Sequence, residues 1–204
     1  MATLYSSIVR EDHGFAPNPY GGVLTLTCCK PDMRLQAQSG DYVAGISGAD
    51  HPAGRKLLLF TAKITARMTM TAYRDWAESE CTDKIPGPVP PHRKLGDAMY
   101  VGPDLTRDRR GYQDRSNRAE DVRGRYALLS RFPDFAYFGS RPVELPEHLR
   151  PITGVRRYYW SRKNDDYLPR FVEWFDSLQD RGLRHSPTLG PMAYQPVTVQ
   201  NART

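Results

Sequence analysis

The N-terminal third of the chain alternates short runs of β-forming residues with polar turns. Branched, aromatic and small apolar residues concentrate in residues 3–10, 23–29, 42–47 and 57–66. Such residues favour strands, and the Gly, Pro, Asn, Asp and Ser between the runs favour turns. Because the connections are short and polar, the pattern predicts an antiparallel sheet or barrel.

Two later segments have helical patterns. Thr69 or Thr71 can cap a helix through residues 72–80, which have good helix-forming composition. A long C-terminal helix is predicted over residues 165–183, with Gly182 at the C-cap position. Apolar residues recur there three and four positions apart, at Leu168, Phe171, Val172, Phe175 and Leu178.

Irregular segments separate these elements. Residues 82–96 contain four prolines and are predicted to form an extended loop, because proline removes a backbone donor and restricts the preceding residue. Residues 104–125 are polar and rich in arginine, and we expect them to be the most mobile part of the fold, ordered by a ligand. A strand is expected to follow at residues 126–130.

These elements together predict one α+β domain over residues 1–185 and a proline-containing tail over residues 186–204. The sheet is expected to be mostly antiparallel and barrel-like, with flanking helices and the long C-terminal helix. A chain of 204 residues with 39% hydrophobic content can build one such core.

Charge adds a functional indication. The net charge is +6, and arginine supplies 23 of the 29 basic residues. Residues 107–131 carry eight arginines against four acids, and residues 150–163 carry four arginines and one lysine with no acid. Clustered guanidinium groups are typical of proteins that bind nucleotides or nucleic acids. The alternative is a solvated basic surface without a ligand.

Cysteine usage and hydropathy indicate the compartment. The three cysteines are an odd number, which suits a reducing environment. No apolar run approaches the roughly 20 residues that span a bilayer, and no secretory signal is present. We therefore expect a cytoplasmic protein with no membrane segment.

Neither a metal nor a cofactor is indicated. Cys28 and Cys29 are expected on a strand, where their side chains would point to opposite faces and could not hold one ion together. No Cys or His spacing typical of zinc sites occurs elsewhere in the chain.

The loop at residues 14–22, Gly-Phe-Ala-Pro-Asn-Pro-Tyr-Gly-Gly, is the strongest candidate for a binding site. Two prolines stiffen it and hold Asn18 between Phe15 and Tyr20. An amide beside two aromatic rings can hydrogen-bond a flat base and stack on it. The same residues also fit a rigid surface turn whose rings cover a core edge.

Four further residues complete the predicted binding site. Tyr137 and Phe138 would supply a second aromatic patch, and Arg10 and Lys30 would face phosphate. This combination predicts a slot that holds a single or flipped base.

An enzyme acting on a nucleotide or nucleobase is the second hypothesis. Asp12 and His13 could provide a carboxylate and an imidazole, although adjacent loop residues seldom converge on one atom. Asp41 and Lys84 are also available, but a Gly-Asp turn commonly uses its carboxylate to accept backbone N–H groups. No nucleophile elbow, Walker loop or zinc-deaminase spacing is present.

Several segments resemble the nucleotide-modification-associated domain 2 family, over roughly residues 3–183. The matching segments are Ile8-Val9-Arg10, residues 14–22, residues 24–31, residues 40–45, residues 68–73, Lys84-Ile85-Pro86, residues 96–100, Leu128-Leu129-Ser130 and Tyr137-Phe138-Gly139. The resemblance implies a link to genes for modified DNA bases in bacteria and phages. The arginine-rich residues 104–125 depart from what is expected of the family.

A weaker similarity concerns the fold alone. The turn Gly40-Asp41-Tyr42-Val43 resembles the PUA-like group, which includes ASCH and EVE domains. That similarity implies a small barrel holding RNA or a modified base in a cleft, but function does not follow from fold.

Three functions remain open at this stage. Recognition of a nucleotide or modified base is the leading hypothesis, followed by an enzyme of unknown reaction. The third is a protein partner of a DNA-modification enzyme, for which exposed aromatic residues would be anchors.

Overall fold

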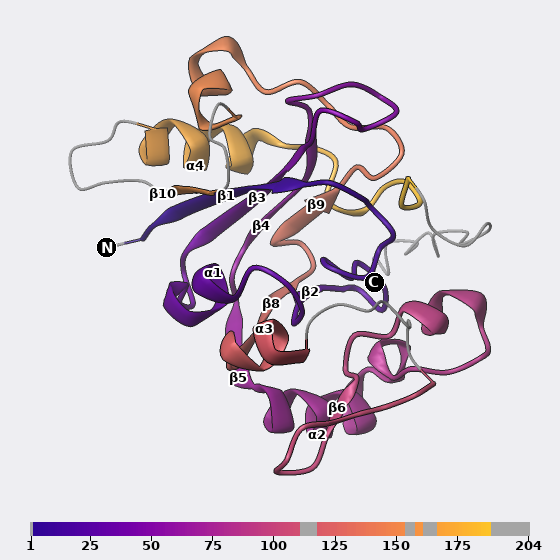
Figure 1. The fold of residues 1–204 in the computed structure, drawn as a ribbon. Helices are drawn as coiled ribbons and strands as arrows, with labels where there is room; N and C mark the ends of the chain where they lie inside the picture. Colours follow the sequence, from indigo (N-terminus) through magenta and orange to yellow (C-terminus); the bar gives the residue numbers. More distant parts are fainter. Residues whose placement is uncertain (1, 111–117, 154–157, 161–166, 189–204) are drawn as a thin grey trace, which may run out of the picture.

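The computed structural model of the protein describes residues 2–110, 118–153, 158–160 and 167–188 (Figure 1). Its largest sheet has six strands in the order β10-β1-β3-β4-β9-β11. Their bounds are β1 Leu4–Val9, β3 Tyr42–Ser47, β4 Leu58–Lys63, β9 Phe135–Tyr137, β10 Tyr158–Trp160 and β11 Gly182–Leu183. The sheet is mixed, because β1 runs parallel to β3 and β9 runs parallel to β11, whereas its other pairs are antiparallel.

A second sheet of three antiparallel strands packs against the first. Its order is β2-β8-β5, with β2 Val23–Leu26, β8 Tyr126–Arg131 and β5 Ala66–Thr69. Apolar side chains from both sheets fill the space between them, among them Tyr5, Val9, Leu24, Leu26, Val43, Leu59 and Leu128. The strands predicted at residues 3–10, 42–47 and 126–130 are confirmed within one or two residues of their ends.

The α+β class is confirmed and most strand pairs are antiparallel, but the barrel is wrong. In the described residues no sheet closes on itself. The chain leaves the six-stranded sheet at Ile64, whose N–H donates to Asp41 O at 2.8 Å, and Thr65 N then donates to Leu129 O at 2.8 Å in the other sheet. The apolar run at residues 57–66 is therefore two strands, β4 and β5, in two different sheets.

Helix α4, Tyr167–Ser177, covers the outer face of the six-stranded sheet (Figure 1). Phe171 and Phe175 are buried among Leu4, Tyr42 and Ala44 of that sheet. The helix is 11 residues long, so the predicted helix over residues 165–183 is too long at its C-terminal end. The apolar spacing stops at Leu178, and the chain then pairs as β11 with the edge of β9.

Residues 23–29 form a shorter strand than predicted. β2 ends at Leu26, and Cys29 and Lys30 have positive φ angles of 57° and 45°. These two left-handed residues turn the chain into helix α1, Pro31–Gln36. The expectation that Cys28 and Cys29 lie together on a strand is therefore wrong.

Helix α2, Met70–Glu80, lies on the side of the molecule opposite α4 (Figure 1). Its cap is confirmed, because the Thr69 side-chain oxygen accepts from Ala72 N at 3.2 Å. Tyr73, Trp76 and Ala77 of α2 pack on the three-stranded sheet. The proline-rich segment that follows contains the 3-10 turns Thr82–Lys84 and Pro91–Leu95 rather than extended chain throughout.

The arginine-rich segment, residues 104–125, contains regular structure at both ends. A hairpin pairs β6, Tyr100–Val101, with β7, Thr106–Arg107. Helix α3, Arg118–Arg123, occupies the other end. Residues 111–117 lie outside the described residues, as do residues 154–157 and 161–163 of the second basic cluster.

The first residues of the predicted tail contact the domain. Ser140 N donates to Ser186 O at 2.8 Å, and Thr188 N donates to Asp12 Oδ2 at 3.0 Å. Residues 189–204 lie outside the described residues, so the boundary at residue 185 stays a prediction.

Replacing Phe171 by Ala should lower the free energy of unfolding by about 3–5 kcal/mol, because it leaves a cavity between α4 and the sheet. Urea unfolding followed by circular dichroism measures the loss. Glu173→Ala, at an exposed position of the same helix, is the control and should cost less than about 0.5 kcal/mol. Equal losses in the two variants would show that α4 does not contribute to the core.

Candidate functional site

Most of the loop at residues 14–22 is buried, and its central side chain bonds to the protein itself. Asn18 is fully buried, and its side-chain amide donates to Leu95 O at 2.9 Å. Its side-chain oxygen accepts from Tyr20 N at 3.1 Å and from Lys84 Nζ at 2.8 Å. The amide expected to contact a base edge is thus occupied by groups of the domain.

Lys84 lies at the centre of a buried polar network around this loop. Its ammonium also donates to Asn18 O at 2.9 Å and to Val23 O at 2.6 Å. Burial lowers the pKa of Lys84 to about 8. The nearby Asp97 is fully buried, and burial raises the pKa of its carboxyl, which the Lys84 charge partly opposes. Asp97 accepts hydrogen bonds from three hydroxyls, those of Thr25, Thr27 and Tyr73, at 2.7, 3.1 and 2.7 Å.

The predicted aromatic residues are also in the interior and do not face one slot. Phe15 and Tyr20 belong to a buried cluster with Leu95 and other side chains near the loop. Tyr137 packs between the two sheets, whereas Phe138 packs on the opposite face of the six-stranded sheet, beneath α4. Ligand binding by these residues stays a prediction.

Asp12 and His13 have separate surroundings. Asp12 is buried and accepts hydrogen bonds from Tyr137 OH through Oδ1 and from the Thr188 N–H and hydroxyl through Oδ2. His13 Nε2 contacts Glu11 Oε2 at 2.9 Å. The carboxylate of Asp12 therefore ties the start of the loop to the C-terminal segment.

Arg10 acts electrostatically on Lys30, another predicted site residue. Burial lowers the pKa of Lys30, and the positive charge of Arg10 acts in the same direction. Lys30 Nζ donates to Ile8 O at 2.6 Å, which holds the side chain against β1. Arg10 is exposed. Phosphate binding by this pair stays a prediction.

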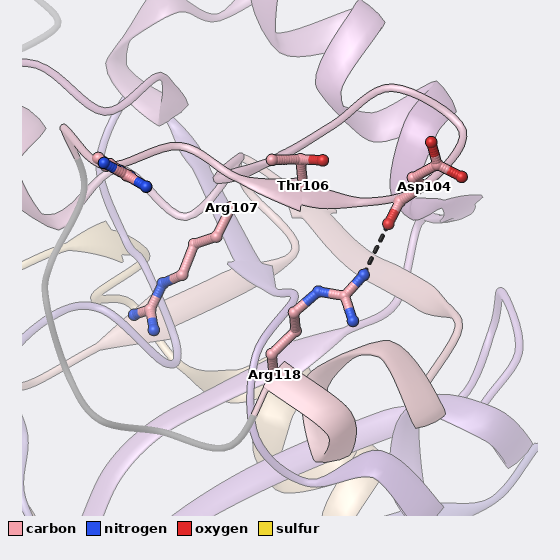
Figure 2. Close-up of a pocket in the computed structure, with 5 residues that line it drawn as sticks. Asp104, Thr106, Arg107 and Arg118 are labelled. Carbon is pink, nitrogen blue, oxygen red and sulfur yellow. Dashed lines mark hydrogen bonds between the residues drawn. The ribbon is translucent and has the colours of Figure 1, made fainter.

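The structure contains a different candidate site, a pocket of about 510 Å³ between the β6–β7 hairpin and α3. Three arginines, one aspartate and one threonine line it: Arg107, Arg109, Arg118, Asp104 and Thr106 (Figure 2). Three guanidinium groups against one carboxylate give the lining a formal charge of +2. Such a lining attracts anions.

Asp104, the acidic residue of the lining, contacts Arg118 through its backbone and not through its carboxylate. Arg118 donates through Nη2 to the backbone oxygen of Asp104 at 2.6 Å and through Nε to Leu105 O at 3.2 Å. Figure 2 shows the Asp104 carboxylate pointing away from the Arg118 guanidinium. Arg118 is thus held in position by neutral carbonyl groups and keeps its full charge.

The side chains of residues 107–110 alternate between two sides of the backbone. Arg107 and Arg109 line the pocket, whereas Asp108 is paired with Arg74 of α2 at 3.2 Å and with Arg110 at 2.6 Å. Hydrogen bonds from the Arg110 side chain lower the pKa of Asp108 to about 2. Alternation of this kind is what an extended backbone imposes.

Sequence reasoning located this segment but named none of its residues as ligand contacts. The signal was the local excess of arginine in residues 107–131. It could not assign individual arginines, because the pocket forms only where α3 packs beside a hairpin that the sequence does not predict.

Two further findings concern metal ligands and membrane spans in the described residues. No group of three or more His, Cys, Asp or Glu side chains in the described ranges is arranged to hold a metal ion. None of the helices described here is long and apolar enough to cross a membrane.

The Lys84→Met variant should lose about 3–5 kcal/mol of unfolding free energy, because it leaves buried acceptors and the Asp97 carboxylate without their cation. Lys94→Met is the matched control, since it removes the same charge from an exposed position in the turn Pro91–Leu95 and should cost less than about 0.5 kcal/mol. Chemical denaturation at neutral pH compares them. A loss of unfolding free energy for Lys84→Met as small as that of the control would show that the network does not stabilise the fold.

Acid should weaken the contribution of Asp108. Its folded-state pKa of about 2 lies below the usual 3.8, so the unfolded chain takes up the proton first as the pH falls. The stabilisation from Asp108 is complete above pH 3.8 and is lost as the pH falls through about 2. The stability difference between wild type and Asp108→Asn, measured by urea unfolding across this range, should shrink toward low pH. A difference that does not change with pH would contradict this account.

Comparison with known proteins identifies the family of this chain. No curated protein and no solved structure matches this chain closely enough to count as a relative. The family model for nucleotide modification associated domain 2 matches residues 1–190, a range that includes every described residue of the chain. The chain therefore belongs to the nucleotide-modification-associated domain 2 family.

Proposed function

We propose that this domain binds the phosphate groups of a nucleotide, free or within a nucleic acid, in the arginine-lined pocket, as part of a nucleotide modification system. The observation that carries the proposal is that Arg107, Arg109 and Arg118 line one pocket. The guanidinium group presents paired donors that match the geometry of phosphate oxygens.

The size and polarity of the pocket support a phosphate-bearing ligand. Its volume of about 510 Å³ falls within the roughly 300–1,000 Å³ of typical small-molecule sites. Typical sites are lined mainly by apolar side chains, whereas this lining is charged and polar and contains no aromatic ring. Phosphate contacts position a ligand, while base contacts and stacking specify it. The pocket thus suits the anionic part of a nucleotide.

The lining also favours binding over catalysis. It contains no histidine, cysteine or lysine, so its only candidate general base or nucleophile is the Asp104 carboxylate or the Thr106 hydroxyl. The candidate catalytic residues Asp12 and His13 contact Thr188 and Glu11 instead. Recognition is therefore the function that the geometry supports best.

Arg109→Ala should weaken nucleotide binding by roughly tenfold or more, the loss expected for one charge-assisted hydrogen bond. Fluorescence polarisation with labelled deoxynucleoside triphosphate, single-stranded DNA and duplex DNA distinguishes free nucleotide from polymer. Binding to polymer should also weaken steeply as salt is added.

Arg184→Ala is the matched control for charge. It removes an exposed arginine whose partner is Asp180, and it lies outside the pocket lining. Affinity should change little in this variant. Absence of binding to all three probes in the wild type, or equal losses in the two variants, would overturn the proposed function.

A further inference from the structure

Asp108 is the acidic residue placed inside the arginine run of residues 107–110. Its side chain is only 8% exposed, whereas that of the neighbouring Arg110 is 59% exposed. Arg107 and Arg109, on either side of Asp108, line the pocket, and Asp108 does not. The carboxylate thus lies behind the pocket wall rather than inside the pocket.

Asp108 makes contacts in two directions. Arg110 donates to it through Nε at 3.0 Å, through Nη2 at 2.6 Å and through its backbone N–H at 3.0 Å. Arg74 donates through Nη1 at 3.2 Å. The backbone N–H of Asp108 donates to Met99 O at 2.6 Å. Both the side chain and the backbone of this residue are therefore held.

The Arg74 contact connects the pocket wall to a rigid element. Arg74 is a buried residue of α2, and the same Nη1 donates to Ala98 O at 2.7 Å. Its Nε donates to Glu78 Oε1 at 2.6 Å. The helix itself is fixed by Tyr73 and Trp76 in the core of the three-stranded sheet. A hairpin with two residues in each strand has little stability of its own, so its geometry depends on such contacts.

The charge of Asp108 and its contacts lead to opposite predictions for the effect of its neutralisation on phosphate binding. As a negative charge behind an anion-binding wall, it would weaken phosphate binding, and its neutralisation would strengthen binding. As the contact that holds residues 107–109 against α2, it would strengthen binding, and its neutralisation would let Arg107 and Arg109 lose their alignment.

We infer that Asp108 is a positioning residue, which orients Arg107 and Arg109 into the phosphate pocket through its contact with Arg74 of α2. This inference rests on the proposed function, since it concerns the same pocket. In this role the negatively charged Asp108 favours binding of an anion, because its contact with Arg74 holds the neighbouring arginines in place.

The test compares two neutralising substitutions by titration with inorganic pyrophosphate. Asp108→Asn should weaken pyrophosphate binding by about fivefold or more, although it makes the protein more positive. Asp104→Asn, which neutralises the acid in the lining itself, should leave affinity unchanged or raise it. Asp108→Glu keeps a carboxylate and should recover part of the loss, which a purely structural lesion would not. Thermal unfolding confirms that each variant is folded at the temperature of titration.

A second variant keeps the inference testable if Asp108→Asn does not fold. Arg74→Lys conserves charge but removes the guanidinium group, whose Nη1 reaches both Ala98 O and Asp108 and whose Nε reaches Glu78, so binding should again weaken by several-fold. If pyrophosphate or nucleotide fails to bind wild-type protein, the proposed function fails. If wild type binds while Asp108→Asn and Arg74→Lys bind as tightly or more tightly, only the positioning role of Asp108 is overturned.

Discussion

A buried ammonium group has to be surrounded by hydrogen-bond acceptors, and around Lys84 this requirement fixes two separate segments of the chain. The acceptors come from the loop at residues 14–22, through Asn18, and from β2, through Val23. The backbone of Lys84 accepts from Ala98 N at 2.9 Å, which fixes the chain just before the β6–β7 hairpin. Removing one partner of such a network costs several kcal/mol, because the remaining groups stay buried and unsatisfied. The hairpin that carries the pocket therefore starts from a rigid point.

The other wall of the pocket is fixed by a second buried charge. Tyr100 of β6 donates to Asp121 Oδ2 of α3 at 2.7 Å, and Cys29 N donates to Asp121 Oδ1 at 2.7 Å. The buried Arg34 guanidinium contacts the backbone oxygens of Cys29, Asp121 and Tyr126. A Cβ atom at Gly124 would overlap that guanidinium, so the chain after α3 needs a glycine there. The two walls thus share Asp121, which explains how a six-residue helix and a short hairpin form one pocket.

Local patterns predicted the elements whose geometry is set locally. The Thr69 cap, the strand at residues 42–47 and the strand at residues 126–130 follow from composition and spacing alone. The carboxylate of Asp41 was also expected to accept backbone N–H groups, and it does so from Thr3 and Gln38. What failed depends on distant partners. Residues 57–66 divide between two sheets because Thr65 pairs with Leu129, 64 residues away, and no local property of the run encodes that.

The candidate site illustrates the same limit. Proline and glycine at residues 14–22 indicate a stiff loop, but they do not say whether Asn18 faces a ligand or Lys84, which is 66 residues distant in the chain. The arginine excess of residues 107–131 indicates anion binding, yet it does not show that Arg107 and Arg109 line the pocket whereas Arg110 pairs with Asp108. The arginine excess therefore indicated the candidate site better than the proline and glycine pattern did, because charge composition does not depend on which residues pair with one another.

The loop at residues 14–22 and the arginine-lined pocket differ in the free energy that ligand contact would cost. For Asn18 to contact a base, it would have to leave Lys84, Leu95 and the Tyr20 backbone, and the ammonium would lose an acceptor in the interior. That rearrangement costs on the order of 3–5 kcal/mol for a broken buried charged pair, whereas stacking of one base contributes about 1–3 kcal/mol. The loop therefore acts as scaffold in this conformation, and a ligand gains more from guanidinium groups already facing a pocket. Because phosphate contacts do not distinguish one base from another, the proposed site would need groups beyond the pocket lining to select a particular base.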